Sequence, residues 1–412
     1  MEQLTPGSLR KAGPGWRQVL LFFITLVTTT IAGAEWMSGK SLFFTEPRLS
    51  FGEVIAGLYF ALPFLGILTV HEFGHFLTAR YHGVHVSWPY YIPLWLGFLP
   101  APSIGTMGAF IRITGPIRSR LQFFDIGISG PLAGFVVALA VLFYGFTHLP
   151  APEHIYSIHP EYEEFGLDYE NHVYEENELN IVLGSNLVFL FFEKVIADPA
   201  KVPNKYEMYH YPWLFAGYLA LFFTALNLIP IGQLDGGHIL YGLLGLRLSR
   251  TVSRMLFMIM VIVSGVGIIP LAPLDFGFVI SLTLYCLFLL LVFHSFEANF
   301  RRRFLLVIWV IIIQLFISRY WPAAGEYGFY LFFALLIGRF LGVDHPRALV
   351  DDPLNSPRKV LGWIALLVFV LSFTPRPIYL EEGKKNRDES PGVIEQTASS
   401  SIVVAGRMIE IF

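Results

Sequence analysis

The chain has 412 residues, of which 55% are hydrophobic, 16% aromatic and only 14% charged. A soluble protein carries roughly a quarter charged residues, so the composition excludes an ordinary soluble domain and indicates a polytopic membrane protein. The net charge of −3 is uninformative about nucleic acid, but the sequence has no basic stripe with interleaved aromatic residues. The single cysteine, Cys286, rules out an internal disulfide.

Apolar runs of about 17–25 residues predict an all-α fold with about nine transmembrane helices. In chain order they cover 18–34, 53–80, 122–148, 212–230, 255–272, 276–296, 304–320, 327–342 and 359–374. With the N-terminus inside, the flanking arginines and lysines fall on the cytoplasmic side, apart from those of the tail. The first run could instead be a cleaved signal peptide ending near Ala32-Gly33-Ala34. An uncleaved helix is favoured, because it gives the second run the direction that its flanking charges require.

The second apolar run ends in His71-Glu72-Phe73-Gly74-His75. Histidines four residues apart lie on one face of a helix, where both can bind one zinc ion, and the adjacent glutamate can take a proton from water. The competing interpretation is that these polar side chains only reach toward the membrane surface. Because the neighbouring residues are apolar and burial of polar groups at this depth is costly, the sequence favours the metal site.

A zinc site needs a third protein ligand, and the candidate is Asp235 in the stretch 227–238, NLIPIGQLDGGH. The fourth apolar run would bring this stretch to the same membrane face as His71. Pro230 and the glycines after it predict unwound backbone, which is tolerated in a membrane where it lines a buried cavity. Asp235 could alternatively, or in addition, cap a short helix over 238–247. His238 is expected either to support the metal ligands from behind or to be incidental, and the incidental interpretation is favoured.

Three further segments lack a transmembrane pattern. The stretch 149–211 holds 12 acidic residues against 3 lysines and is expected to be an extracytoplasmic loop, or else a small cap over the membrane site. The aromatic and proline-rich stretch 88–102 is apolar without helical periodicity, which predicts a re-entrant hairpin. The tail from Thr374 onward is polar and is expected to be loosely ordered.

His71-Glu72-x-x-His75 with the later Asn227-x-x-Pro230-x-x-x-Leu234-Asp235-Gly236 resembles the site-2 proteases, the zinc metalloproteases of regulated intramembrane proteolysis. The similarity extends to 105–110, which resembles the membrane-dipping β-loop of that family, and to 130–134, GPLAG. No inserted peptide-binding domain is visible, so the chain resembles the subgroup without one. The resemblance covers about 53–246, the catalytic core, with a first helix in 1–52, additional helices in 247–374 and a polar tail in 375–412.

The resemblance implies Zn²⁺ held by His71, His75 and Asp235, with Glu72 as general base and Asn227 as a hydrogen-bond donor to the substrate. The implied substrates are single-pass membrane proteins in a lipid bilayer, cleaved after local unwinding. The expected location is a bacterial inner membrane with the active site toward the cytoplasm. The oligomeric state does not follow from the sequence. The alternatives are a divalent-metal transporter, against which Glu72 argues, and an inactive binding scaffold, against which the intact Glu72 also argues.

Overall fold

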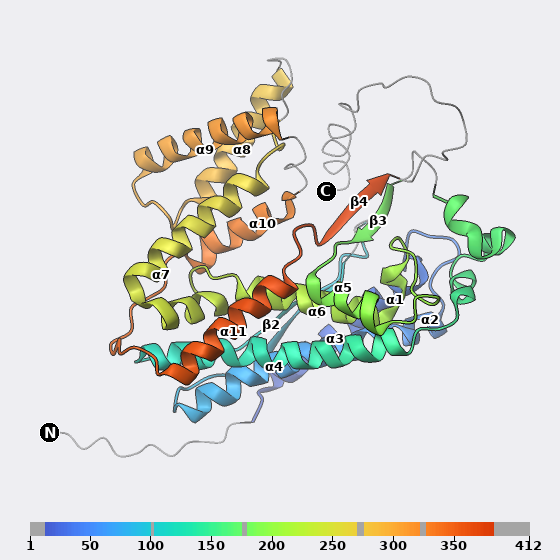
Figure 1. Cartoon of the computed structure of the whole chain (residues 1–412), viewed down its shortest axis with the longest axis horizontal. Coiled ribbons are helices and arrows are strands. Elements are labelled where there is room, and N and C mark those ends of the chain that lie inside the picture. The colour runs from blue at the N-terminus through green and yellow to red at the C-terminus, as the bar shows by residue number, and fades with distance from the viewer. Residues whose placement is uncertain (1–12, 100–102, 175–178, 270–275, 322–326, 383–412) are drawn as a thin grey trace.

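The computed structural model describes residues 13–99, 103–174, 179–269, 276–321 and 327–382 as a mostly helical protein (Figure 1). Its α-helices are α1 (Trp16–Ser38), α2 (Phe51–Ala56), α3 (Leu58–Tyr81), α4 (Arg120–Thr147), α5 (Leu187–Phe191), α6 (Pro212–Leu228), α7 (Asp235–Ser264), α8 (Phe276–Val292), α9 (Phe300–Tyr320), α10 (Phe329–Leu336) and α11 (Ser356–Ser372). Short helical turns are η1 (Pro152–Ser157), η2 (Pro160–Asn171), η3 (Phe192–Ile196), η4 (Met208–His210) and η6 (Ile337–Leu341). The strands are β1 (Tyr90–Leu94), β2 (Gly105–Phe110), β3 (Leu179–Leu183) and β4 (Ile378–Glu382).

Each predicted apolar run overlaps a helix, but the helices differ in their suitability for crossing a membrane. Three are long and apolar enough by length and composition: Trp16–Ser38, Phe51–Tyr81 and Arg120–Thr147. Helix α6 has only 17 residues, and α7 is kinked at Gly245, where φ is 74° and ψ is 172°. A mostly helical protein with three candidate membrane spans among the described residues is therefore confirmed, while the count of nine crossings stays a prediction.

Helices α1 and α3 cross at a point where Gly33 and Gly57 leave no room for a side chain. A Cβ at Gly57 would lie 2.0 Å from the Thr30 carbonyl oxygen, and one at Gly33 would lie 2.7 Å from the Phe60 ring. Small residues at such crossings let helix backbones approach closely in a membrane. The first helix of the chain is consequently packed directly on the helix that carries the His-Glu-x-x-His motif.

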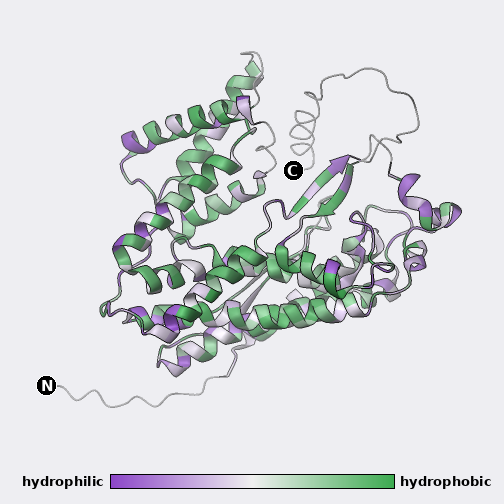
Figure 2. Cartoon of the chain, in the orientation of Figure 1, coloured by the Kyte–Doolittle hydropathy of each residue, from purple (hydrophilic) through white to green (hydrophobic). Residues whose placement is uncertain are grey.

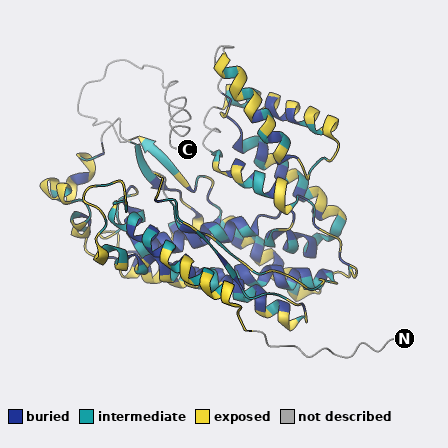
Figure 3. Cartoon of the chain, turned by 180° about the vertical axis from the view of Figure 1, so that it is seen from behind, coloured by how far each residue is buried: buried dark blue, intermediate teal, exposed yellow. Residues whose placement is uncertain are grey.

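Two large apolar clusters form the interior, and most helices bury one face while leaving another exposed (Figures 2 and 3). One cluster joins α1, α3, α4 and α6 through side chains such as Phe60, Phe146 and Phe215. The other joins α7 to α10, with Phe257 and Leu289 fully buried. The end of α6 contributes to the second cluster, so the α6–α7 connection lies where the two clusters meet.

The segment after α3 forms an antiparallel hairpin of β1 and β2, with Tyr90 opposite Phe110 and Leu94 opposite Gly105. A register shift between Ile92 and Pro93 bends it. The hairpin is attached to α1, because the Thr28 hydroxyl donates to the Gly105 carbonyl at 2.7 Å and the Trp36 indole donates to the Ser103 carbonyl at 2.8 Å. The predicted extended segment is present, whereas its depth in a membrane stays a prediction.

The prediction of a loosely ordered tail from Thr374 onward is wrong for its first part. Strand β4 pairs antiparallel with β3, from Leu183 opposite Ile378 to Leu179 opposite Glu382. The strand has only five residues and its partner is almost 200 residues earlier, so no local pattern predicts the pairing. The rest of the tail, 383–412, lies outside the described residues.

Charged side chains link α4 to α11 and to the end of α3. Arg358, at the start of α11, donates two hydrogen bonds to the Asp125 carboxylate, at 2.7 and 2.9 Å. His82, which follows α3, lies 2.9 Å from the same carboxylate. Arg358 is one of the basic residues that the charge pattern assigns to the cytoplasmic side, and its contact ties the start of α11 to α4.

The Asp125–Arg358 pair is expected to stabilise the fold by coupling α4 to α11. We predict a coupling free energy of about 1–3 kcal/mol in a cycle of Asp125→Ala, Arg358→Ala and the double variant. The free energy of unfolding, measured by denaturant titration in detergent, checks this value. The matched control is the exposed pair Glu46–Arg48, for which about 0–1 kcal/mol is expected. Equal coupling in the two cycles would contradict the prediction.

Candidate metal centre

Helix α3 presents His71 and His75 on one face, and both side chains are buried. The Nε2 atoms of the two rings are 3.1 Å apart. Nδ1 of His75 lies 2.7 Å from the Ile126 carbonyl oxygen, which can only accept, so Nδ1 carries the hydrogen. Nε2 of His75 therefore turns a lone pair toward His71, the orientation that metal-binding imidazoles need.

Asp235 reaches these histidines from the α6–α7 connection. Its Oδ2 atom lies 3.3 Å from Nε2 of His75 and 3.5 Å from Nε2 of His71. Asp235 is the first residue of α7 and makes no capping hydrogen bond, and the N-cap position belongs to Leu234. The alternative role of Asp235 as a helix cap is thus not supported, and its side chain is free to face the histidines.

The backbone between α6 and α7 is unwound and tightly folded. Gly232 has a φ of 59°, and its amide donates to the Ser253 hydroxyl at 2.9 Å. A Cβ at Gly236 would lie 2.0 Å from the Leu228 carbonyl oxygen, so the chain can fold back here only with glycine. The glycines noted in the sequence consequently hold Asp235 in place.

Asn227 and Glu72 complete the surroundings of the two histidines. The Asn227 side-chain nitrogen lies 3.3 Å from Nε2 of His71. Glu72 is 5% exposed, and its carboxylate accepts a hydrogen bond from the backbone of Ile111, directly after β2. The structure thus brings all five predicted site residues together, and their chemical roles stay predictions.

Helix α4 supplies a glycine surface that the sequence alone does not connect to the histidines. A Cβ at Gly130 would lie 2.2 Å from Nε2 of His75, and one at Gly134 would lie 3.1 Å from Cβ of His71. On the facing helix, a Cβ at Gly74 would lie 2.6 Å from the Ser129 carbonyl oxygen. These glycines let α4 pack against the face of α3 that carries His71 and His75. The GPLAG motif at 130–134 is the sequence feature from which this contact could have been predicted.

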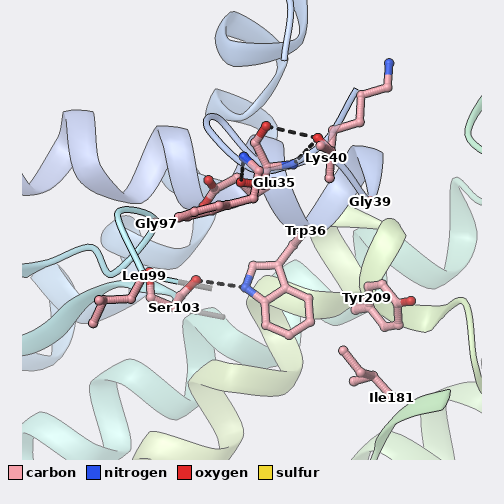
Figure 4. Close-up of a pocket in the computed structure, with 12 residues that line it drawn as sticks. Glu35, Trp36, Gly39, Lys40, Gly97, Leu99, Ser103, Ile181 and Tyr209 are labelled. Atoms are coloured by element: carbon pink, nitrogen blue, oxygen red, sulfur yellow. Dashed lines mark hydrogen bonds between the residues drawn. The ribbon is translucent and has the colours of Figure 1, made fainter. Parts of the chain in front are cut away.

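Two other features lie apart from this cluster. His238 contacts His345, with Nδ1 2.7 Å from Nε2, and is not among the side chains that converge with Asp235. A cavity of about 310 Å³ lies beside Trp36, Ser103 and Tyr209 (Figure 4). No residue of the His71–His75–Asp235 group lines that cavity.

The fold and this cluster define a helical membrane protein with a buried group of potential metal-binding side chains. Residues 59–271, more than half of the chain, match Peptidase family M50. The chain belongs to this family.

Several curated plant proteins are similar to the same region. "Probable zinc metalloprotease EGY2, chloroplastic" from Oryza sativa subsp. indica is 31% identical over 199 residues, covering 48% of this chain and 31% of that protein. "Probable zinc metalloprotease EGY1, chloroplastic" from Arabidopsis thaliana is 28% identical over 261 residues, covering 58% of this chain and 43% of that protein. The chain therefore spans less than half the length of these relatives. No solved structure matches.

Proposed function

We propose that this chain is an intramembrane zinc metalloprotease that hydrolyses peptide bonds within or near the transmembrane segments of membrane-anchored proteins. The observation that carries the proposal is the convergence of His71, His75 and Asp235, from segments about 160 residues apart in sequence, next to Glu72. Family membership and the names of the plant relatives support the same chemistry.

The donor set fits zinc. Two imidazole nitrogens and one carboxylate oxygen, all within 4.8 Å of one another, are ligands that zinc prefers, and three protein ligands leave a fourth position open. When bound there, zinc supplies a Lewis acid for the substrate carbonyl and lowers the pKa of a water molecule to about 7. The hydrogen bond from His75 to the Ile126 carbonyl holds the ring in the tautomer that metal binding requires.

Glu72 acts in this proposal as the general base. Its carboxylate takes the proton of the attacking water and returns it to the leaving amine. The contact with the Ile111 backbone orients the carboxylate at the end of β2. Glu72 therefore lies between the histidines and the strand that is best placed to bind an extended substrate.

Asn227 is proposed to donate hydrogen bonds to the substrate carbonyl. Its amide lies 3.3 Å from the same His71 nitrogen that would bind the metal, which puts it within reach of a group bound there. The simpler interpretation is that Asn227 only joins α6 to α3. An Asn227→Ala variant that kept both zinc and full cleavage rate would exclude the substrate role.

The substrate is proposed to bind as an added strand beside β2, because a peptide must be unwound to expose its amides. Strand β2 pairs with β1, and its Met107 side chain is exposed. A photo-crosslinking residue at Met107 is expected to capture a single-pass substrate, and no capture in a catalytically inactive variant would contradict strand addition. We place the chain in a bacterial inner membrane with this site toward the cytoplasm, although the relatives named above are chloroplastic.

Zinc content tests the assignment of ligands. Asp235→Ala and His71→Ala are each expected to bind one zinc fewer per chain than the wild type, with cleavage reduced to background. Asp198→Ala, an exposed aspartate, serves as the control and is expected to retain all zinc. Inductively coupled plasma mass spectrometry of the detergent-purified chain gives the count. A full zinc complement in Asp235→Ala would mean that the third ligand lies elsewhere.

A further inference from the structure

A second group of metal-binding side chains lies at the opposite end of α6 from the first. His159 precedes η2, whereas Glu207 and His210 lie just before α6, and their ligand atoms are within 4.8 Å of one another. Glu207 and His210 are 2% and 1% exposed. At about 1.5 Å per residue, the 17 residues of α6 put about 25 Å between this group and Asn227. The two groups are thus separate sites.

The Nε2 atom of His210 carries no hydrogen and faces the other two side chains. Its Nδ1 atom lies 3.0 Å from the Met37 carbonyl oxygen, which can only accept, so Nδ1 carries the hydrogen. Nε2 of His210 is therefore a lone-pair donor, 3.3 Å from Nε2 of His159 and 3.3 Å from Oε2 of Glu207.

His159 has the same orientation. Its Nδ1 atom lies 3.1 Å from a carboxylate oxygen of Glu161, so the hydrogen belongs on Nδ1 and Nε2 again faces the group. Nε2 of His159 is 3.7 Å from Oε2 of Glu207. A carboxylate on the outer nitrogen of an imidazole is the arrangement found behind many histidines that bind zinc.

Glu207 supplies the third acceptor. Its Oε1 atom accepts hydrogen bonds from the Tyr174 hydroxyl at 2.5 Å and from the Tyr162 hydroxyl at 3.4 Å. Its Oε2 atom is buried and has no hydrogen-bond partner among the residues that the structure describes. Burying a carboxylate oxygen without a hydrogen-bond donor costs free energy. This oxygen faces the unprotonated Nε2 atoms of His159 and His210, which cannot donate to it.

We propose that His159, Glu207 and His210 bind a second divalent metal ion, Zn²⁺, which serves a structural role. Three acceptors meet here, and one proton would satisfy only part of the group, whereas a dication satisfies all three. Zinc bonds of about 2.0–2.2 Å in tetrahedral geometry separate ligand atoms by roughly 3.3–3.6 Å. The observed separations are 3.3, 3.3 and 3.7 Å. Because the His159 side chain is partly exposed, a water molecule can occupy the fourth coordination position of the ion.

The ion would join three parts of the chain. His159 lies in the first third of the acidic segment 149–211, His210 lies at the end of that segment just before α6, and Met37, whose carbonyl orients His210, is near the end of α1. The apolar cluster within this segment is small, with five buried residues. Small units with little buried apolar surface commonly depend on a metal for stability. The segment 149–211 is thus a metal-stabilised cap.

Metal content and limited proteolysis of the full chain test this proposal independently of catalysis. Metal-free protein in detergent is incubated with ZnCl2 and the bound zinc is counted in the wild type, His159→Ala, Asp235→Ala and the double variant. The matched control is His172→Ala, an exposed histidine directly after η2 whose side chain contacts Asp168 and Phe165. His159 is chosen because it is the most exposed ligand, so its loss leaves the helical core intact.

The expected zinc counts are two for the wild type and His172→Ala, one for each single variant and none for the double variant. Zinc should also slow proteolytic cleavage within 149–174 in the wild type, and in Asp235→Ala, but not in His159→Ala. Zinc that is lost in His159→Ala and kept in Asp235→Ala would support the second site and refute the proposed catalytic ligands. Unchanged zinc content and unchanged protection in His159→Ala would overturn the second site.

Discussion

Glu72→Gln is expected to reduce peptide-bond cleavage by about 10²–10⁴-fold while leaving the zinc content unchanged. Glutamine has the shape of glutamate but cannot accept the proton of the attacking water. Because Glu72 is buried against the Ile111 backbone, the isosteric change leaves the packing of α3 intact. Initial rates on a single transmembrane peptide in bicelles, with zinc counted on the same sample, measure both effects.

The control for this variant is Glu46→Gln, an exposed glutamate outside the cluster, which is expected to keep the full rate. Cleavage by Glu72→Gln at the wild-type rate would remove Glu72 from the mechanism. The same variant separates the protease from the transporter. In a divalent-metal transporter, Glu72→Gln would leave metal flux into vesicles intact, and the wild type would cleave no substrate.

Gly130→Ala is expected to abolish one equivalent of zinc binding and, with it, proteolysis. The added Cβ would lie 2.2 Å from Nε2 and 2.5 Å from Cε1 of His75, so either the ring or the whole of α4 must move. Gly74 packs α3 directly against the α4 backbone, which leaves little room for such a shift. A displaced His75 loses both the Ile126 hydrogen bond and its place beside Asp235.

The matched control is Gly66→Ala, in the middle of α3, where an added Cβ meets no atom within 4 Å. Both changes replace a helical glycine by alanine and raise intrinsic helix propensity by about 1 kcal/mol, so propensity alone predicts the same result for both. Zinc count and cleavage rate are compared in the two variants. Full zinc in Gly130→Ala would show that His75 does not depend on the close approach of α4.

The site was more predictable from the sequence than the fold around it. The spacing of His71 and His75 sets their common face, since the helical period is local information. Asp235 could be assigned to the same site only because its motif and the His71–His75 motif occur together in one protein family. The structure brings the three side chains together. The Gly130 contact and the cluster of His159 with Glu207 and His210 are long-range, so no local period predicts them. Glu207-x-x-His210 was the only signal of the latter.

Strand β4 determines when the fold can be completed during synthesis. Its partner β3 lies at 179–183, almost 200 residues earlier, so the β3 edge emerges from the ribosome long before anything can pair with it. Pairing across such a separation is slow, because the intervening chain must first be ordered. The segment 149–211 and α11 therefore reach their final arrangement only after residue 382 has been made. Until then, the unpaired edge of β3 is a site at which a chaperone, or another copy of the chain, can bind.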